Sequence, residues 1–214
     1  MSEEKKNILK EIFEWAYCII IAVVLALLVK YYVGTPTIVK QTSMAPTFNS
    51  NDRLILNRLY RTCKTVPQRG DIITFEAPSV NYTNGEEADL KNPVAVYNKE
   101  IKGIISKFFY NVIEVGKTSY IKRVIGIPGE HIQIKDGKVY INGEQLEEKY
   151  LDADVVTTSE VFYDFIVPEG YVFCMGDNRP NSKDCRDLGC IPLEKIEGIV
   201  TFRFWPFSAW GKID

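Results

Sequence analysis

The feature that most constrains this chain is a run near its N-terminus that carries no charged residue from Trp15 to Val29. If Glu14 and Lys30 are admitted, the apolar segment extends over residues 12–33, which is 22 residues. A helix of that length rises about 33 Å at about 1.5 Å per residue, close to the hydrocarbon thickness of a bilayer. The segment therefore predicts a transmembrane anchor over residues 12–33.

The residues at the two ends of the run also favour a membrane span. Trp15, Tyr31 and Tyr32 have rings that favour the headgroup level, and the adjacent lysine can extend its ammonium outward. A cleavable secretion signal is one alternative, but it would want small residues after the run, where Lys-Tyr-Tyr-Val stands. A buried core helix is the other, although so continuous an apolar surface is hard to bury in a small domain.

The lysines around the span indicate its orientation. Three precede it and two follow it closely, namely Lys5, Lys6, Lys10, Lys30 and Lys40. By the positive-inside rule this small bias favours a cytoplasmic N-terminus. We therefore expect a single-pass protein of the cell membrane, with residues 1–11 in the cytoplasm and residues 34–214 outside it.

Composition excludes several classes of function. The 26 Lys and Arg against 28 Asp and Glu give a net charge of -2, so no basic excess draws the chain onto nucleic acid. One His and five scattered Cys, with no C-x-x-C pair, do not fill a zinc site at any usual ligand spacing. We expect no nucleic acid partner, no metal and no cofactor.

Beyond the anchor, short apolar runs alternate with turn signals, as is typical of β structure. Asp136-Gly137 predicts a hairpin between two of these runs, and Asn142-Gly143 is a second tight-turn pair. Strands without intervening helices predict a mainly β domain, an antiparallel barrel or a sandwich-like fold. The predicted strands cover residues 53–56, 71–75, 120–127, 131–134, 139–141 and 171–175.

One stretch breaks the β pattern. Residues 77–98 predict an exposed loop, because turn signals and polar residues dominate there. The next apolar residues recur at the spacing of one helical face and predict an amphipathic helix over residues 99–113, with three lysines nearby. Its apolar face either packs on its own domain or lies on a membrane surface. The face consists of Ile101, Ile104, Ile105, Phe108, Phe109, Val112 and Ile113, and the lysines are Lys99, Lys102 and Lys107.

Three further segments carry residues with chemical potential. Ser43 lies ten residues beyond the span in a turn-like stretch, where a surface serine would also be ordinary. Lys122 lies in an apolar strand, and alternation alone leaves open whether its face is buried or solvated. Residues 176–186 are too polar for a strand and too rich in Asp and Asn for an ordinary linker, which predicts a structured loop.

Taken together, these segments resemble the bacterial type I signal peptidases, the membrane-bound serine proteases that remove signal peptides from exported proteins. The resemblance rests on four blocks in order behind one anchor: SMAPT from Ser43, GDIITF from Gly70, YIKRVIGIPGE from Tyr120 and GDNRPNSKDCR from Gly176. It covers nearly all of residues 12–207. Residues 77–116 are the exception and look like an insertion between the second and third blocks.

The resemblance implies a Ser/Lys dyad, with Ser43 as the nucleophile and Lys122 as the general base. It also implies that the Ser182 hydroxyl holds the lysine amine in place, while Asp184 and Arg186 shape the loop beneath it. The only histidine, His131, stands at the head of a predicted strand and is not expected to be catalytic.

A lysine base has a physical requirement. Near its ordinary pKa of about 10.4, only about one lysine in 2,500 is neutral at pH 7. Lowering the pKa to about 7 needs a penalty of about 4.6 kcal/mol on the ammonium, which desolvation in apolar sites can supply. We therefore expect Lys122 to be buried, so that its neutral amine can take the Ser43 proton during attack.

The resemblance assigns the oxyanion donors only in part. The backbone N–H of Ser43 is the expected donor, joined in many members by a side chain two residues earlier. That position holds Gln41 here, in place of the commoner Ser, Gly or Asp. We hypothesise that the Gln41 amide is the second donor.

The cysteines leave two alternatives open. Cys185 stands where many relatives have Ser, and a small buried thiol in place of a hydroxyl is one interpretation. A disulfide is the other, because the domain is expected outside the reducing cytosol. Cys63, Cys174, Cys185 and Cys190 allow three full pairings, none of which the sequence selects, and Cys18 would lie in the bilayer.

Substrates and partners follow from the resemblance. It implies secretory preproteins cut after small-x-small motifs, with the peptide added to strand edges near residues 37–42. Tethering enzyme and substrate in one bilayer raises their effective concentration. We expect a monomer. Aromatic residues near the C-terminus either enter the membrane interface or end a core strand, and these are Phe204, Trp205, Phe207 and Trp210.

Two rival classes remain. One is a membrane-tethered β-domain that keeps the fold and has lost the reaction, acting as a binding or assembly module. The retention of every implied site residue argues against it. The other is a self-cleaving Ser/Lys regulator, but such proteins are soluble and carry DNA-binding or partner domains for which this chain has no room.

Overall fold

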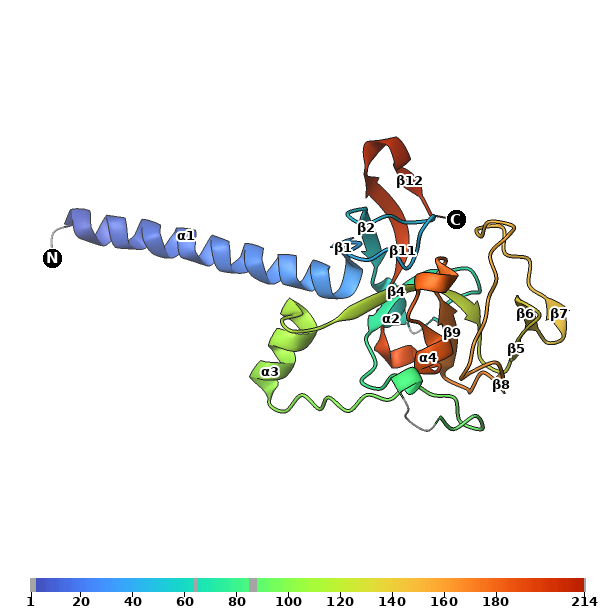
Figure 1. The fold of residues 1–214 in the computed structure, drawn as a ribbon. Coiled ribbons are helices and arrows are strands. Elements are labelled where there is room, and N and C mark those ends of the chain that lie inside the picture. Colours follow the sequence, from blue (N-terminus) through green and yellow to red (C-terminus); the bar gives the residue numbers. More distant parts are fainter. Residues whose placement is uncertain (1–2, 64, 85–87, 214) are drawn as a thin grey trace.

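In the computed structural model, which describes residues 3–63, 65–84 and 88–213, one long helix projects from a β domain (Figure 1). Helix α1 (Glu3–Leu28) continues into the π-helical turn η1 (Val29–Val33). Within the described residues, Lys10–Val33 is the one helix long and apolar enough to cross a membrane. Since 0% of its most apolar window is buried, the alternative of a core helix is wrong.

The domain consists of two antiparallel sheets, which confirms the predicted mainly β fold. The larger sheet has the strand order β1-β2-β11-β3-β4-β9-β10, with β12 paired to β11. Its strands are β1 (Gly34–Ile38), β2 (Arg53–Asn57), β3 (Ile72–Glu76), β4 (Ser119–Gly126), β9 (Tyr171–Met175), β10 (Ile191–Pro192), β11 (Ile196–Trp205) and β12 (Gly211–Lys212).

The smaller sheet has the order β7-β6-β5-β8 and contains the predicted hairpin. The turn residues Asp136 and Gly137 have φ values of 52° and 74°, the left-handed pair that a two-residue hairpin requires. All six predicted strands are present among the twelve observed. The strands of this sheet are β5 (His131–Lys135), β6 (Lys138–Ile141), β7 (Glu144–Gln145) and β8 (Asp164–Ile166).

The longest strand, β11, was not predicted. It lies between β2 and β3 and also pairs with β12. The strand is not recognisable in the sequence, because Glu197 and Gly198 interrupt the apolar pattern that a buried strand would show. Gly198 is required by close packing, since a Cβ there would lie 2.8 Å from the carbonyl oxygen of Asn57. Glu197 is buried because it pairs with Lys117 at 2.7 Å.

The short helices lie in the connections. They are α2 (Leu59–Cys63), α3 (Ile104–Phe108), α4 (Cys185–Leu188), the π-helical turn η3 (Phe109–Ile113) and the 3-10 turns η2 (Tyr82–Asn84), η4 (Arg179–Asn181), η5 (Leu193–Lys195) and η6 (Phe207–Ala209). The predicted exposed loop over 77–98 is only partly exposed, because Ala95 is buried and its amide donates to the Cys190 carbonyl at 2.9 Å. Residues 85–87 of that loop lie outside the described residues.

The amphipathic helix begins later than predicted. It runs from Ile104 to Ile113 through α3 and η3, rather than from residue 99, because Gly103 at its N-terminal boundary has a φ of 88°. Ile104 and Ile105 are 88% and 74% exposed, so this end of the apolar face does not pack on the domain.

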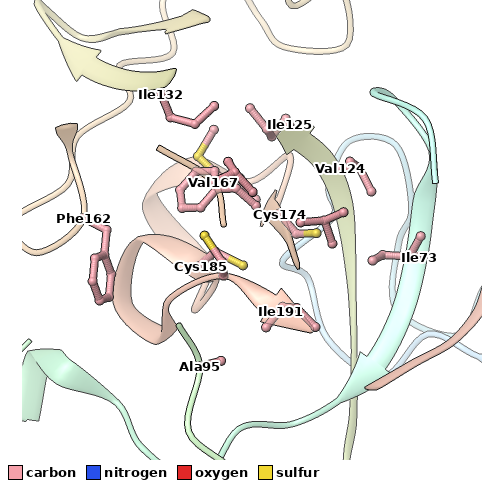
Figure 2. Close-up of a cluster of buried hydrophobic side chains, with 14 of the residues drawn as sticks. Ile73, Ala95, Val124, Ile125, Ile132, Phe162, Val167, Cys174, Cys185 and Ile191 are labelled. Atoms are coloured by element: carbon pink, nitrogen blue, oxygen red, sulfur yellow. The ribbon is translucent and has the colours of Figure 1, made fainter. Parts of the chain in front are cut away.

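Two apolar clusters form the core. The larger contains Ile73, Val124, Phe162 and Ile191 together with three cysteines (Figure 2). The smaller lies under the loop between β1 and β2 and is made of Val39, Met44, Phe48, Leu54, Leu56, Ile72 and Val200.

All five cysteines are free, which settles the two alternatives in favour of thiols. Cys174, Cys185 and Cys190 are buried in the larger cluster, whereas Cys18 and Cys63 are exposed. Burial raises the pKa of the Cys174 and Cys190 thiols well above their ordinary value. These two therefore act as small apolar side chains.

Candidate active site

The two residues singled out for chemistry are in direct contact. Lys122 Nζ donates a hydrogen bond to Ser43 Oγ at 2.7 Å and another to the Ile121 carbonyl at 3.0 Å. Ser43 is 4% exposed and Lys122 is 1% exposed. The predicted burial of Lys122 is therefore confirmed, and the amine and the hydroxyl are close enough to share a proton.

Apolar neighbours position Ser43. It lies in the loop between β1 and β2, where Met44 and Phe48 are fully buried in the smaller core cluster. Two turns shape the loop: the Ala45 amide donates to Thr42 O at 3.0 Å, and the Phe48 amide donates to Met44 O at 2.8 Å. Burial of these two side chains holds the turn in place, and Ser43 with it.

Strand β4 positions Lys122. It runs between β3 and β9, and the residues from Lys122 to Gly126 are all buried. Strand alternation left open which face of β4 is buried, and the structure shows that both are. Lys122 and Val124 therefore lie on one buried face while Arg123 and Ile125 lie on the other.

Burial changes the acid–base properties of Lys122. Desolvation lowers its pKa from 10.5 to about 8, although the negative charge of Asp184 opposes the shift. At pH 7 about one molecule in ten then has a neutral amine, against about one in 2,500 for an exposed lysine. The site thus supplies much of what a lysine base needs.

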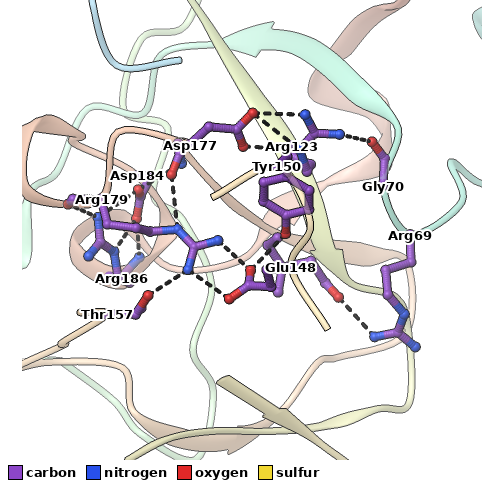
Figure 3. Close-up of polar contacts among 12 residues, drawn as sticks. Arg69, Gly70, Arg123, Glu148, Tyr150, Thr157, Asp177, Arg179, Asp184 and Arg186 are labelled. Carbon is purple, nitrogen blue, oxygen red and sulfur yellow. Dashed lines mark hydrogen bonds and ion pairs between the residues drawn. The ribbon is translucent and has the colours of Figure 1, made fainter. Parts of the chain in front are cut away.

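Asp184 and Arg186 fasten the polar loop that follows β9. The Asp184 carboxylate accepts hydrogen bonds from the Gly176 amide at 2.9 Å and from Arg186 Nε at 2.9 Å. Arg186 also donates to the Thr158 carbonyl at 3.1 Å and to the Arg179 carbonyl at 2.7 Å. Figure 3 shows Asp184, Arg186 and Arg179 together. The loop is structured, as the sequence predicted.

Ser182 does not make the implied contact. Its hydroxyl is buried without a hydrogen-bond partner among the described residues, and Lys122 donates elsewhere. The serine nevertheless lies close to the pair. A Cβ added to Gly176 would lie 2.1 Å from Ser182 Oγ and 2.4 Å from the Ser43 carbonyl oxygen, so only glycine fits between them.

Sequence reasoning missed an ion pair beside the site. Arg123 donates to Asp177 from Nε at 3.0 Å and from Nη2 at 2.8 Å, and both side chains are buried (Figure 3). Thr47 Oγ1 donates to the same carboxylate at 2.5 Å, and Arg123 also donates to the Gly70 carbonyl at 2.9 Å. Each of these four residues comes from a different one of the four sequence blocks.

A signal for this ion pair was present in the sequence. Arg123 is a second charge in an apolar strand, next to Lys122, and a buried arginine needs an acidic partner. Asp177 lies two residues after the end of the buried strand β9. The pairing joins residues 54 apart, however, and strand order is required to recognise it.

A groove of about 400 Å³ is lined by two segments that end just before Ser43 and Lys122 in the sequence. Residues 35–41 line one side and residues 117–121 line the other. Gln41 is exposed at its end, two residues before Ser43, and Ile121 precedes Lys122. An extended peptide placed between these two segments would reach the serine hydroxyl.

His131 lies in the other sheet. In β5, its Nε2 is 2.6 Å from Asp164 Oδ1, and both side chains are about half exposed. This contact lowers the pKa of Asp164.

The chain has relatives along its whole length. It matches the family described as "Signal peptidase, peptidase S26" over residues 12–205. A signal peptidase I from Bacillus licheniformis is 35% identical, with 100% of both chains covered. Signal peptidase IB of Staphylococcus aureus (strain COL) is 30% identical, over 93% of this chain and 92% of its own. A solved signal peptidase I from Enterococcus faecalis V583 covers 64% of this chain and 98% of its own, with a TM-score of 0.42 and 28% identity.

The chain belongs to the signal peptidase family, peptidase S26, and the resemblance drawn from the four sequence blocks is confirmed.

The ion pair predicts a large effect of Asp177→Ala. Removing the carboxylate leaves the Arg123 charge buried without its partner, which costs about 3–5 kcal/mol of unfolding free energy. Chemical unfolding of the detergent-solubilised protein measures it. The control Asp154→Ala, at an exposed acid, should change stability by less than about 0.5 kcal/mol. Equal stability of the two variants would contradict the assignment.

Lysine burial predicts that Lys122→Met stabilises the protein. Below pH 8 both folded and unfolded chains carry the proton, so the folded state bears the full penalty of a buried ammonium, about 3 kcal/mol. Between pH 8 and about 10.4 only the unfolded chain stays charged, and the penalty fades. Lys122→Met should therefore raise the unfolding free energy at pH 7 by up to about 3 kcal/mol and by little at pH 10.5.

Measuring the unfolding free energy of wild type and Lys122→Met at pH 7 and pH 10.5 tests whether the substitution stabilises the protein as expected. Lys149→Met is the matched control, because that ammonium is largely exposed and has no burial penalty to remove. A Lys122→Met protein that is less stable than wild type at pH 7 would overturn the interpretation.

Proposed function

We propose that this chain is a membrane-anchored serine endopeptidase that removes N-terminal signal peptides from exported preproteins. The observation that carries the proposal is the 2.7 Å contact between Lys122 Nζ and Ser43 Oγ in a dry site, in a chain of the signal peptidase family. Relatives that match it over nearly their full length are named signal peptidase I.

The dyad performs the reaction in two halves. In the first, neutral Lys122 takes the Ser43 hydroxyl proton while Oγ attacks the scissile carbonyl. The tetrahedral intermediate collapses to an acyl-enzyme as the Lys122 ammonium gives its proton to the leaving amine. In the second half, Lys122 deprotonates a water, which attacks the ester, and the proton returns to Ser43 Oγ as the acid leaves. No metal or cofactor takes part in either half.

The supporting residues act by holding these groups in place. Asp184 and Arg186 fix the loop that packs on the Ser43 carbonyl, and the Asn178 amide donates to that carbonyl at 3.0 Å. We assign the oxyanion to the backbone N–H of Ser43 and the side-chain amide of Gln41. Ser182, next to the pair, is assigned to orient the Lys122 amine once substrate is bound.

The groove suits an extended substrate. A peptide between residues 35–41 and residues 117–121 can bond to strand edges on both sides, so recognition depends on its backbone. We infer from the family that small side chains precede the cut, in a small-x-small motif. The same inference puts residues 12–33 in the cell membrane as a single span, residues 1–11 in the cytoplasm, and residues 34–214 outside it as a monomer.

The rival reading, an inactive β-domain that only binds, has no observation in its favour. A buried lysine beside a buried serine is costly to maintain for binding alone.

The deciding experiment incubates the purified full-length protein with a signal-bearing precursor and follows cleavage on gels. We expect wild type to cut, and Ser43→Ala and Lys122→Ala to lose at least a thousand-fold in rate, because each lacks one half of the dyad. Ser50→Ala and Lys149→Ala, at exposed positions, are matched controls that keep wild-type rates.

Each contrary outcome has a definite meaning. Precursor that survives wild-type enzyme would remove the peptidase function, and cleavage that persists in Ser43→Ala would remove the assigned nucleophile. Loss of activity with a chelator would show that a metal is needed after all.

The pKa of Lys122 predicts the pH dependence of kcat/KM. Since the reactive form is the neutral amine and its pKa is about 8, kcat/KM should rise about ten-fold per pH unit below 8 and level off above it. The control His131→Gln should leave this midpoint unchanged, because His131 is in the other sheet. A flat profile between pH 6 and 9 is incompatible with a lysine base of this pKa.

The oxyanion assignment predicts that Gln41→Ala lowers kcat by at least about ten-fold while KM stays within two-fold, because the amide acts on charge that develops only in the transition state. Steady-state kinetics on a soluble precursor separate the two constants. An unchanged kcat would leave the Ser43 N–H as the assigned donor and remove Gln41 from the mechanism.

A further inference from the structure

The amphipathic helix exposes apolar side chains beyond what a soluble surface usually carries. Ile104 and Ile105 are 88% and 74% exposed, and Phe108 and Phe109 are 44% and 50% exposed. These four residues lie on two successive turns of the helix and form one patch, which we call the α3 patch. Contiguous exposed apolar groups of this size mark a contact surface rather than solvent-facing structure.

The other end of the helix is fixed to the domain. Tyr110 is buried, and its hydroxyl donates to Glu76 Oε1 at 2.8 Å. Glu114, just after the helix, pairs with Arg58 in an ion pair and with Lys30 at 3.3 Å. The helix that carries the α3 patch is therefore fixed to the domain at its C-terminal end.

The same contacts place the helix beside the membrane end of the anchor. Lys30 Nζ, in the turn that ends the apolar helix, donates to the Ile113 carbonyl at 3.3 Å. Figure 1 shows α3 on the side of the domain from which α1 departs. Lys30 follows the uncharged run and is expected at headgroup level, so the C-terminal end of the helix lies at that level too.

The charges around the patch suit an anionic lipid surface. Lys102 and Lys107 are exposed, with Glu100 the nearest acid to Lys102, at 3.3 Å. Lys99 Nζ donates a hydrogen bond to the Gly116 carbonyl at 3.1 Å and lies over the Tyr110 ring. A short helix with an apolar patch and flanking lysines is the pattern of a segment that lies in the membrane interface.

We propose that the α3 patch inserts into the outer leaflet as a second membrane contact, with the lipid bilayer as its partner. One helix alone leaves the domain free to rotate and tilt about the end of the anchor. A second contact, from an element fixed to Glu76 and Arg58, sets the height and direction of the groove above the bilayer. This proposal is independent of the peptidase reaction and concerns only how the domain sits.

A depth measurement on the full-length protein tests it. Cys18 and Cys63, the exposed cysteines, are replaced by Ser, and a nitroxide is attached at Ile105→Cys. Val156→Cys is the matched control, because Val156 is 62% exposed and lies in the connection between β7 and β8, outside the helix. Both proteins are reconstituted into vesicles of phosphatidylcholine with or without phosphatidylglycerol.

At each site we measure how strongly dissolved oxygen relaxes the label and divide it by the effect of a water-soluble nickel complex. We expect this ratio to be at least five-fold higher at position 105 than at position 156, because oxygen concentrates in the bilayer and the nickel complex stays in water. The difference should grow when phosphatidylglycerol is present. Equal access of the nickel complex to both labels would overturn the proposal. Spin–spin broadening at 105 that disappears on dilution with lipid would also overturn it, because a second copy would then be the partner.

Cleavage gives an independent readout in the same vesicles. Ile105→Glu with Phe108→Glu should slow cleavage of a membrane-embedded precursor at least five-fold and leave cleavage of a short soluble peptide unchanged, while Val156→Glu changes neither. Equal loss on both substrates would mean damage to the domain and would contradict a membrane role. If wild type cuts neither substrate, the peptidase proposal fails, but the label depths still decide this one.

Discussion

The structure depends on keeping the Lys122 amine out of water beside Ser43. The lysine is 1% exposed in a strand that is buried on both faces, and desolvation is what lowers its pKa to about 8. Burying a lysine lowers the stability of the fold, and well-paired buried polar groups nearby offset part of that cost. The Arg123–Asp177 pair does this one residue along the strand, and it binds Thr47 and Gly70 as well. The same pair therefore satisfies a buried charge and holds the loops that surround the dyad.

What could be predicted from the sequence was local. The long apolar helix at the N-terminus followed from an uncharged run, and six strands followed from alternation and tight turns. Strand β11 was not predicted because a buried ion pair and a packed glycine break its pattern, and both depend on partners far along the chain. Burial of Lys122 was required by chemistry but could not be read from alternation, since the coverage of β4 depends on sheet order. The resemblance to the family implied a hydrogen bond between Ser182 and the lysine. In this structure Ser182 lies near the Ser43–Lys122 pair, but its hydroxyl does not make that bond.

Ion pairs join the end of the N-terminal helix to the groove. Glu114 contacts Lys30 at the end of the anchor and also Arg58, and both Glu114 and Arg58 line the groove. Arg58 is 1% exposed and has two guanidinium nitrogens without a partner among the described residues. The segment between β3 and β4 thus contributes part of the groove wall as well as the helix beside the anchor. If this segment contacts the bilayer as proposed, its position there would also affect the shape of the groove.

If the chain cleaves preproteins as proposed, the path from the N-terminal helix to Ser43 sets where a substrate is cut. The apolar helix ends at Val33 and the groove is lined from Thr35 to Gln41, two residues before Ser43. Seven extended residues span at most about 23 Å. On the function proposed above, a peptide that leaves the bilayer alongside this helix enters the groove almost at once and reaches the serine after about seven residues of its own. The proposed cleavage is then restricted to bonds at that distance from the lipid, and backbone pairing along the groove would tolerate varied sequences because the distance supplies part of the selectivity.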